Sequence, residues 1–368
     1  MTVVWGILGL SFLVFFHELG HFFLAQICGV EVEAFSVGMG PVLLHHKWGK
    51  TDYRLSLIPV GGYCQMKGEA DYKIAIEQNK SEIQSEKDSF YGVSPFRRLL
   101  IAFAGPFFNL IFAFFAFVII AQIGYTYYDA GTKINVQKDD FSPAKEAGLE
   151  DGDIITALDG KAVFYFTEIA DYVSLRANQD ILFTVERGGE NLDFVVHSDL
   201  NKETGSGRVG IISAGKLDIE RQYGGFSFFP SLKEGFFQTI SMLDATLKGI
   251  SSLFKGVKLT SAVSGPARVS TMLGDSVKQG FSVGIKEGIV TTLQFLALIS
   301  ISLFLTNLLP IPVLDGGLIL FSLIEGISGK KMHPKLLYYI QFVGIAFIAV
   351  LLIIAVTGDI NYFFNRWR

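Results

Sequence analysis

The first apolar stretch of the chain contains His17, Glu18 and His21 in the pattern His-Glu-x-x-His. Residues four apart lie on one face of a helix, so both imidazoles can bind one zinc ion. Glu18 then adjoins the pair and can act as general base on a metal-bound water. The alternative is a pair of buried, hydrogen-bonded histidines, but ionisable groups inside a membrane helix are costly and usually functional. The sequence therefore predicts a catalytic zinc site.

A catalytic zinc ion usually has three protein ligands and one open position. The candidate for the third ligand is Asp315, at the end of the segment Asn307-Leu-Leu-Pro-Ile-Pro-Val-Leu-Asp315. The two prolines stop or bend a helix, and backbone freed in this way is tolerated in a membrane only where it lines a polar cavity. An aspartate that only caps a turn is the alternative. We expect Asp315 to complete the metal site.

The composition indicates a membrane protein. Of the 368 residues, 50% are hydrophobic and only 18% are charged, whereas about a quarter are charged in an average soluble domain. A net charge of -4 provides no basic surface for nucleic acid, and two cysteines exclude a disulfide-rich scaffold. Four segments have the roughly 20 mostly apolar residues that a span requires: residues 4–27, 99–122, 289–309 and 337–357.

Lysine and arginine are concentrated in two connections between these spans, residues 28–98 and 312–336. Because cytoplasmic loops carry an excess of these residues, both connections are predicted to be cytoplasmic. The N-terminus, the C-terminus and residues 123–288 are then extracytoplasmic. The first and third spans run in the same direction, so His21 and Asp315 can meet on the cytoplasmic side.

Patterning between the spans predicts the remaining parts. Alternating apolar and polar residues with intervening glycines predict a β-meander at the membrane surface, and apolar residues at helical spacing predict interfacial helices. In chain order we expect a first transmembrane helix with the zinc motif (1–29), a cytoplasmic-side β-meander (30–66), a charged cytoplasmic linker (67–98), a second transmembrane helix (99–122), a soluble β-rich module (128–214), interfacial amphipathic helices (228–285), a third transmembrane helix with the zinc-ligand loop (289–317) and a fourth transmembrane helix (337–357).

Two paired motifs resemble those of a known family. His-Glu-x-x-His in a first membrane helix, with Asn-x-x-Pro-x-Pro-x-Leu-Asp-Gly in a later one, resembles the site-2 protease family of intramembrane metalloproteases. The order of parts is similar to the regulator of sigma E protease group of bacteria. Further matches are FSVGMGP at 35–41, PVGGYCQM at 59–66, AGPFFN at 104–109 and SGP at 264–266.

The resemblance implies roles for individual residues. It implies three zinc ligands, His17, His21 and Asp315. It implies that Glu18 is the general base and that Asn307 binds or polarises the substrate backbone. It also implies that Asn109 lies near the site as a substrate-binding residue, although a helix-packing amide explains Asn109 equally well. It further implies the bacterial inner membrane as the location.

The soluble module has a signature of its own. The segment Ser142-Pro-Ala-Lys-Glu-Ala-Gly148-Leu-Glu-Asp-Gly-Asp-Ile-Ile155, followed by Asp159-Gly160, resembles bacterial PDZ domains. Gly148 is expected to end a short helix, and Asp159-Gly160 to form a hairpin turn. PDZ domains capture extended peptides by strand addition. The resemblance leaves two roles open, a peptide-binding domain and a steric filter without peptide affinity.

These observations together predict a polytopic α-helical membrane protein with about four transmembrane helices, a membrane-associated β-meander and one extracytoplasmic PDZ domain. The predicted function is a zinc endopeptidase that cleaves single-span membrane proteins, such as anti-sigma factors or remnant signal peptides, by regulated intramembrane proteolysis. The predicted partners are these substrates, the lipid bilayer and a peptide ligand of the PDZ domain, without nucleic acid. A metal transporter and a catalytically inactive PDZ scaffold are the alternatives. A strand edge within residues 52–66 is expected to hold the substrate in an extended form.

Overall fold

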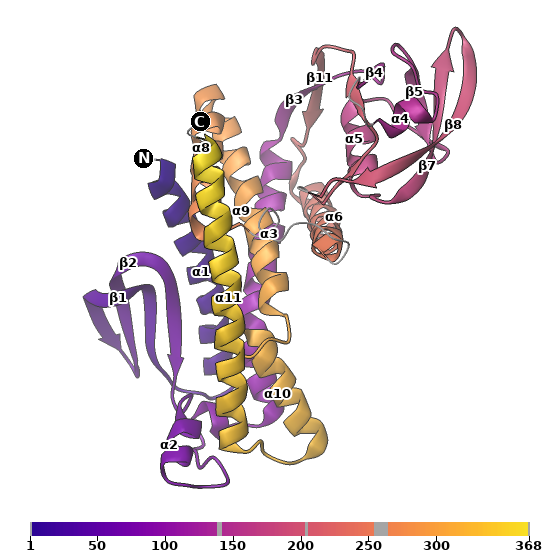
Figure 1. Cartoon of the computed structure of the whole chain (residues 1–368). Coiled ribbons are helices and arrows are strands. Elements are labelled where there is room, and N and C mark those ends of the chain that lie inside the picture. Colours follow the sequence, from indigo (N-terminus) through magenta and orange to yellow (C-terminus); the bar gives the residue numbers. More distant parts are fainter. Residues whose placement is uncertain (1, 138–141, 203–204, 254–263, 367–368) are drawn as a thin grey trace. The chain divides into compact units, whose positions relative to one another are not determined.

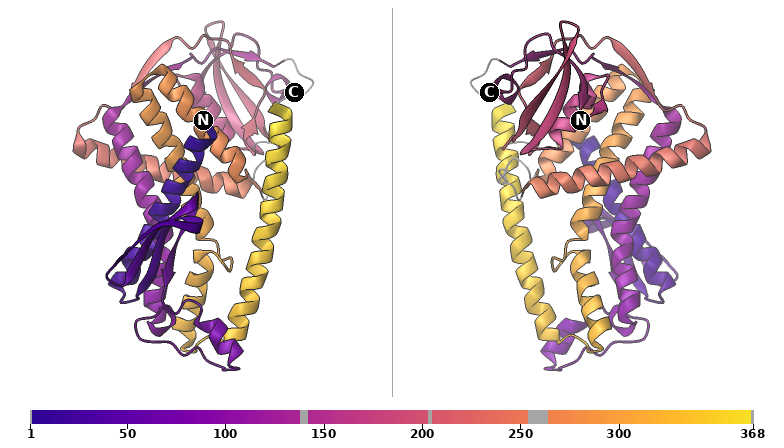
Figure 2. Two further views of the ribbon diagram at one scale, coloured as in Figure 1. Left: turned by 90° about the vertical axis from the view of Figure 1, so that its left-hand side faces the viewer. Right: turned by 90° about the vertical axis from the view of Figure 1, so that its right-hand side faces the viewer.

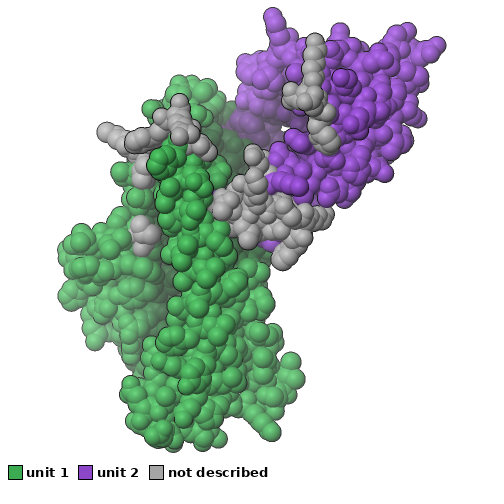
Figure 3. Space-filling view, viewed as in Figure 1, with its two compact units in different colours: residues 1–120, 228–239, 265–368 green, residues 121–227, 240–264 purple. Residues whose placement is uncertain are grey.

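The computed structural model describes residues 2–137, 142–202, 205–253 and 264–366 (Figure 1). These residues form two compact units, which Figure 3 distinguishes by colour. Unit 1 comprises residues 1–120, 228–239 and 265–368, and unit 2 comprises residues 121–227 and 240–264.

Unit 1 contains the helices that are long and apolar enough to cross a membrane. The qualifying segments among the described residues are Val4–Ile27 of α1 (Thr2–Ile27), α3 (Pro95–Ile123), α9 (Ile285–Asn307) and Pro334–Phe364 of α11 (Pro334–Arg366). Each predicted span coincides with one of these helices. The prediction of four membrane helices is therefore confirmed by length and composition.

Glycines allow the helices of unit 1 to approach one another closely. A Cβ atom on Gly20 of α1 would lie 2.3 Å from the carbonyl oxygen of Ala104 in α3, and one on Gly6 would lie 2.0 Å from that of Ser270. Neither contact is possible with a side chain at the glycine. Small residues have this role in membranes, where helix association depends on close packing.

The predicted β-meander is a folded hairpin of two long strands, β1 (Val32–Trp48) and β2 (Thr51–Met66). Residues 34–37 of β1 lie opposite residues 62–65 of β2 on one side and residues 52–55 on the other. Residues 42–48 pair with residues 51–56. The order across the sheet is therefore 42–48, 51–56, 34–37 and 62–66, with residues 62–66 at one edge.

This sheet lies alongside α1, which differs from the expected position at the membrane surface (Figures 1 and 2). Phe35 packs edge-on against Phe15 and Phe22 of α1, and the hydroxyl of Ser11 donates to the carbonyl oxygen of Pro59. The sheet therefore extends from near the C-terminal end of α1 to its middle. Its exposed apolar side chains, which include Leu43, Leu44 and Leu57, form a surface of the kind that contacts lipid.

Residues 67–98, expected as a charged linker, are packed against the helices of unit 1. The segment forms α2 (Asp71–Glu77) and the 3-10 turn η1 (Phe90–Gly92). Tyr72 and Ile83 are buried in one cluster with Phe321 and Leu337. The Tyr72 hydroxyl also donates to Gln341 Oε1 at 2.6 Å. Apolar residues spaced among the charges therefore anchor this segment.

Two further predicted segments contain helices. Asp315 is the first residue of a helix, α10 (Asp315–Ser328), and not part of a loop. Within 228–285, α6 (Phe228–Leu253) exposes apolar side chains such as Phe229 and Phe237, as an interfacial helix would. The second helix, α8 (Pro266–Val283), buries Ser270, Thr271 and Leu273 and packs against α1 and α9. α8 is therefore packed among the helices of unit 1, and its interfacial position stays a prediction.

Unit 2 contains a PDZ-like module. Its five-stranded antiparallel sheet has the order β6 (Lys161–Ala162), β5 (Ile154–Leu158), β7 (Gln179–Arg187), β8 (Glu190–Leu200) and β9 (Gly207–Arg208). The remaining elements are the helices α4 (Pro143–Glu146) and α5 (Phe166–Ser174) and the strand pairs β4 (Ile134–Val136) with β10 (Ile211–Ser213) and β3 (Tyr125–Asp129) with β11 (Ile219–Tyr223).

The turns of this module are those that the sequence predicts. Gly148 follows α4 with φ +97, a left-handed conformation that favours glycine. Asp159 and Gly160 both have positive φ, 47° and 75°, as the two-residue turn of a β-hairpin requires. Apolar side chains such as Ile155, Phe183 and Val185 are fully buried in the core. The β3–β11 pair extends the unit beyond the predicted range of 128–214.

Candidate metal centre

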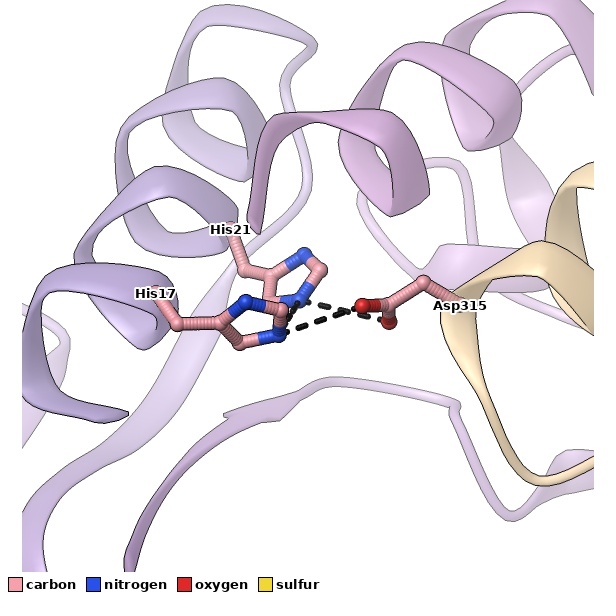
Figure 4. Close-up of side chains that lie close together, drawn as sticks. All are labelled: His17, His21 and Asp315. Atoms are coloured by element: carbon pink, nitrogen blue, oxygen red, sulfur yellow. Dashed lines mark hydrogen bonds and ion pairs between the residues drawn. The ribbon is translucent and has the colours of Figure 1, made fainter. Parts of the chain in front are cut away.

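Two helices of unit 1 bring the predicted ligands together (Figure 4). His17 and His21 lie one turn apart on α1, and Asp315 begins α10. The Nε2 atom of His17 lies 3.1 Å from Asp315 Oδ2, and that of His21 lies 3.3 Å from Asp315 Oδ1. The two Nε2 atoms are 3.2 Å apart. Both histidines are buried.

These separations fit a zinc ion. Ligand atoms about 2.0–2.1 Å from a tetrahedral zinc ion are about 3.3–3.4 Å from one another, close to the three distances here. Within the described ranges, His17, His21 and Asp315 form the group of metal-capable side chains whose ligand atoms converge. The donor set of two imidazoles and one carboxylate leaves the fourth tetrahedral position for water or substrate, as in catalytic zinc sites.

A hydrogen bond to the backbone of α3 fixes the orientation of the His21 ring. Its Nδ1–H donates to the carbonyl oxygen of Ile101 at 2.8 Å. Since Nδ1 carries the hydrogen, Nε2 presents its lone pair to the site, which is the tautomer that a metal ligand needs. A Cβ atom at Gly105 would lie 2.2 Å from His21 Nε2. The glycine of the AGPFFN segment is therefore required by the space that the His21 ring occupies.

Asn109 holds His17 in the same way. The amide of Asn109 lies 3.1 Å from His17 Nδ1, on the side of the ring opposite Asp315, and the residue is fully buried. Its Oδ1 has no hydrogen-bond partner within the described part of the chain. Rotating the amide by 180° brings this oxygen to Nδ1, where it accepts the hydrogen of a histidine whose Nε2 binds metal. Asn109 thus contacts a ligand, whereas the sequence suggested that it contacts substrate.

The chain before Asp315 is tightly constrained. A Cβ atom at Gly316 would lie 2.1 Å from the carbonyl oxygen of Leu309, and one at Gly317 would lie 2.6 Å from that of Ile311. Val313 has φ 90, which is rare and strained for a β-branched residue. The turn between α9 and α10 therefore folds back closely on the start of α10. This conformation directs the Asp315 carboxylate at α1.

A cavity of about 350 Å³ adjoins the ligands. Glu18, His21 and Asp315 line it together with the edge segment Tyr63–Met66 and Glu69. Glu18 is therefore next to the ligand cluster without being part of it, as a general base must be. Glu69 is a third carboxylate on this cavity, which sequence analysis missed because Glu69 stands in a generally charged segment with no motif spacing.

Asn307 is not part of this group. It is the last residue of α9 and is half-buried, and its side chain has no hydrogen bond to another described residue. The residues that line the cavity do not include it. Asn307 is therefore near Asp315 in the sequence but is not in the wall of the cavity. A contact between Asn307 and the substrate remains a proposal.

The sequence is related to proteins that are named as zinc metalloproteases. The model of "Peptidase family M50" matches residues 5–351. A Treponema pallidum protein, "Putative zinc metalloprotease", is 35% identical over 449 residues, which cover 99% of this chain and 100% of that protein. A Campylobacter jejuni protein with a similar name is 34% identical over 366 residues, covering 96% of this chain and 92% of that protein.

Among solved structures, the PDZ domain of an SdrC-like protein from Listeria monocytogenes matches 24% of this chain and 92% of its own, with 25% identity and a TM-score of 0.21. The apolar helices and the ligand cluster, together with the relatives, define a multi-pass membrane zinc metalloprotease. The chain belongs to peptidase family M50, the site-2 protease family.

Proposed function

We propose that this protein is an intramembrane endopeptidase that cleaves single-span membrane proteins during regulated intramembrane proteolysis. The observation that carries the proposal is the convergence of His17, His21 and Asp315 from two helices, beside a cavity with a strand edge in its wall. His17 and His21 belong to a helix that is long and apolar enough to cross the membrane. The site is therefore reached by a substrate that lies in the bilayer.

His17, His21 and Asp315 would hold the zinc ion through two nitrogens and one carboxylate. A zinc ion bound there supplies Lewis acidity, which polarises a carbonyl and lowers the pKa of a water molecule to near neutrality. Glu18 removes the proton of the attacking water and returns it to the leaving amine, as general base and then general acid. Asn109 and the Ile101 carbonyl keep the imidazoles in the required tautomer. Asn307 would bind the substrate backbone.

The edge segment Tyr63–Met66 is the candidate for holding the substrate in an extended form. Residues 62–65 pair with residues 34–37 on one side only, whereas residues 52–55 have a partner strand on both sides. The free side of the edge can therefore accept a further strand. Strand addition satisfies backbone groups that an unwound helix would leave unpaired in lipid. Within the expected range of 52–66, residues 52–55 are therefore interior, which leaves Tyr63–Met66 as the edge.

The proposed topology follows the basic residues. Arg97 and Arg98 lie at the start of α3, and Lys330 and Lys331 lie between α10 and α11. The positive-inside rule places the start of α3 and the connection between α10 and α11 on the cytoplasmic side of a bacterial inner membrane. The two termini and the PDZ-like module are then extracytoplasmic. The module would either bind a peptide of the substrate or exclude substrates with a large external domain.

A reconstituted cleavage assay tests the proposal. The full chain and a single-span substrate, such as a remnant signal peptide or an anti-sigma factor, are incorporated into the same liposomes. We expect chelator-sensitive cleavage by the native protein and a loss of about 10²–10⁴-fold in Glu18→Gln, with zinc content unchanged. Glu82→Gln, a change at an exposed glutamate away from the cavity, serves as the control. Zinc transport without cleavage, or neither activity, would contradict the proposal.

A proline scan of residues 63–66 tests the strand edge. Where the replaced N–H points at residues 34–37, proline should disturb the sheet. At the alternate positions the N–H points away, so proline should leave folding and zinc content unchanged and abolish cleavage. If every proline variant that retains zinc also cleaves normally, the substrate is held elsewhere.

A further inference from the structure

A second cavity in unit 1 lies apart from the metal centre, where membrane helices begin and end. Its volume is about 420 Å³. It is bounded by η1 and the first turn of α3 on one side, and by the C-terminal end of α10 and the following connection on the other. The lining includes Tyr91, Pro95, Arg98, Glu325, Gly326 and Lys330–Lys331.

Arg98 is the central polar group of this cavity. It is only 6% exposed, and its Nη2 donates to Glu325 Oε2. Its Nε has no hydrogen-bond partner within the described ranges. Buried side-chain donors normally have a partner, so this N–H requires an explanation. The guanidinium carbon also lies 5.4 Å from the centre of the Tyr91 ring, which helps to fix its position.

Glu325 pairs with Arg98 through Nη2, but it does not accept from Arg98 Nε in this geometry. Its Oε2 accepts from Arg98, and its Oε1 accepts from the backbone N–H of Met332 at 2.7 Å. Both carboxylate oxygens therefore already have donors. A molecule that enters the cavity can supply the acceptor that Arg98 Nε lacks among the described residues.

The charge of the cavity favours an anion. Arg98 and Glu325 offset each other, which leaves the two cations Lys330 and Lys331 at the exposed rim. The N-terminal end of α3, a 29-residue helix, adds the partial positive charge of its dipole. Arginine and lysine side chains grouped with a helix N-terminus are the donors that bind phosphate groups.

The location indicates the source of the phosphate. The cavity lies where α3 enters its apolar segment and where α10 leads into α11. Basic pockets between membrane helices at such a level bind the head groups of anionic lipids. We propose that this cavity binds a phosphate group, provided by the head group of an anionic phospholipid. This inference does not depend on the proposed protease activity, because it is tested by binding.

The test uses the purified, delipidated full chain and native mass spectrometry, with phosphatidylglycerol and phosphatidylcholine as probes. We expect tighter binding of phosphatidylglycerol. Lys330→Ala/Lys331→Ala should weaken it by about tenfold, since each lysine near an anionic lipid contributes to binding. Gly326→Leu should also weaken it without changing the charge. The Gly326 Cβ position meets only Pro95 Cβ, at 3.7 Å, so the new side chain has room to fill the cavity.

A matched double variant separates this site from general surface charge. Lys87→Ala/Lys335→Ala removes the same charge from exposed lysines that do not line the cavity, and it should change binding by less than twofold. Equal binding of the two lipids, or equal weakening by both double variants, would overturn the proposal. Glycerol 1-phosphate tests whether the bound phosphate comes from a lipid head group or from a soluble molecule. If it binds with the same dependence on the variants, the anion site is supported with a soluble phosphate as its ligand.

Discussion

Unit 1 and unit 2 differ in the kind of internal contact that stabilises each of them. In unit 2, large apolar side chains such as Ile155, Leu158 and Phe183 are fully buried in a continuous core. In unit 1, helices approach one another closely at glycines, such as Gly20 against α3 and Gly105 against the ring of His21. Burial of apolar side chains stabilises a domain in water, but it contributes little between helices surrounded by lipid.

Because of this difference, the buried polar residues of unit 1 have two roles. Buried hydrogen bonds there join helices and also orient the metal ligands, as at His21 with Ile101 and at His17 with Asn109. The Ser300 hydroxyl donates to the backbone oxygen of Asn109 at 2.8 Å and links α9 to the same point. Packing and metal-ligand orientation therefore depend on the same residues in unit 1, whereas the unit 2 core consists of apolar side chains.

The largest effect is expected at the helix contact beside the metal. In Gly105→Ala the added Cβ would lie 2.2 Å from His21 Nε2, so the ring has to leave its position. We expect loss of bound zinc and a decrease in cleavage of at least about 100-fold, larger than for typical changes outside the ligand set. In Gly249→Ala, within α6, the added Cβ would meet no described atom within 4 Å outside its own helix backbone, so this variant should leave zinc unchanged. Normal zinc content in Gly105→Ala would contradict this account of the contact.

A core substitution in unit 2 should lower the stability of the module without changing the zinc content. Phe183→Ala should lower the free energy of unfolding of the module by about 3–5 kcal/mol, because it leaves a cavity in the core. Hydrogen exchange of the β7 and β8 amides in the full chain measures the change. Zinc content should stay at the native value. Leu182→Ala, at the neighbouring residue, which is 36% exposed, is the control with a small expected effect. Zinc loss in Phe183→Ala would show that the units are not independent.

Removal of the Asn109 side chain should weaken the metal site without abolishing it. We expect Asn109→Ala to lower zinc affinity by about 10–100-fold, the effect typical of a lost hydrogen bond to a ligand. Competition with a chromophoric chelator measures the affinity. Asn109→Asp keeps an acceptor for His17 Nδ1–H and should lose less. An unchanged affinity in Asn109→Ala would mean that the amide only packs the helices.

The smallest expected effect is the pH dependence of unit 2. Burial raises the pKa of Asp153, but hydrogen bonds from Arg187, at 2.7 Å to each carboxylate oxygen, outweigh burial and hold that pKa below its ordinary value. The ionised carboxylate therefore stabilises the fold above the ordinary carboxyl pKa of about 3.9, and this stabilisation is lost as the pH falls through the lowered value.

Thermal unfolding of a soluble fragment of residues 125–223, whose ends pair as β3 and β11, measures this effect. Asp153→Asn should lower the free energy of unfolding by about 1 kcal/mol at pH 7. The difference from the native fragment should shrink below about pH 4, where the carboxyl group of the unfolded chain begins to protonate, and should vanish as the pH falls through the lowered pKa of the folded state. A difference that is the same at pH 7 and pH 3 would exclude this ion pair as its cause.

Local patterns in the sequence predicted much of this structure. The spans were found because their apolar runs are long, and the histidine pair because its spacing is that of one helix turn. Asp315 could be assigned because two spans run in the same direction. The start of α10 was missed because Gly316 and Gly317, after two prolines, resemble a loop. The roles of Gly105 and Asn109 depend on contacts about 80–90 residues away in sequence, which local patterns do not contain.

The position of the sheet was also beyond prediction from sequence. Alternation along residues 30–66 indicates strands, but the packing of Phe35 against α1 is a tertiary contact. In the same way, α8 has the amphipathic pattern of an interfacial helix, yet its small polar residues Ser270 and Thr271 are buried against other helices. In membranes, small residues such as serine and threonine are enriched where helices pack against one another.

The central claim is that Asp315 joins His17 and His21 in binding zinc, and metal analysis of the purified full chain tests it most directly. The native protein and Glu18→Gln should each contain about one zinc ion per chain, because Glu18 lies beside the ligand cluster and outside it. Asp315→Ala should lose most of its zinc, as should His17→Ala and His21→Ala. Full zinc content in Asp315→Ala would show that another residue completes the site and would contradict the account.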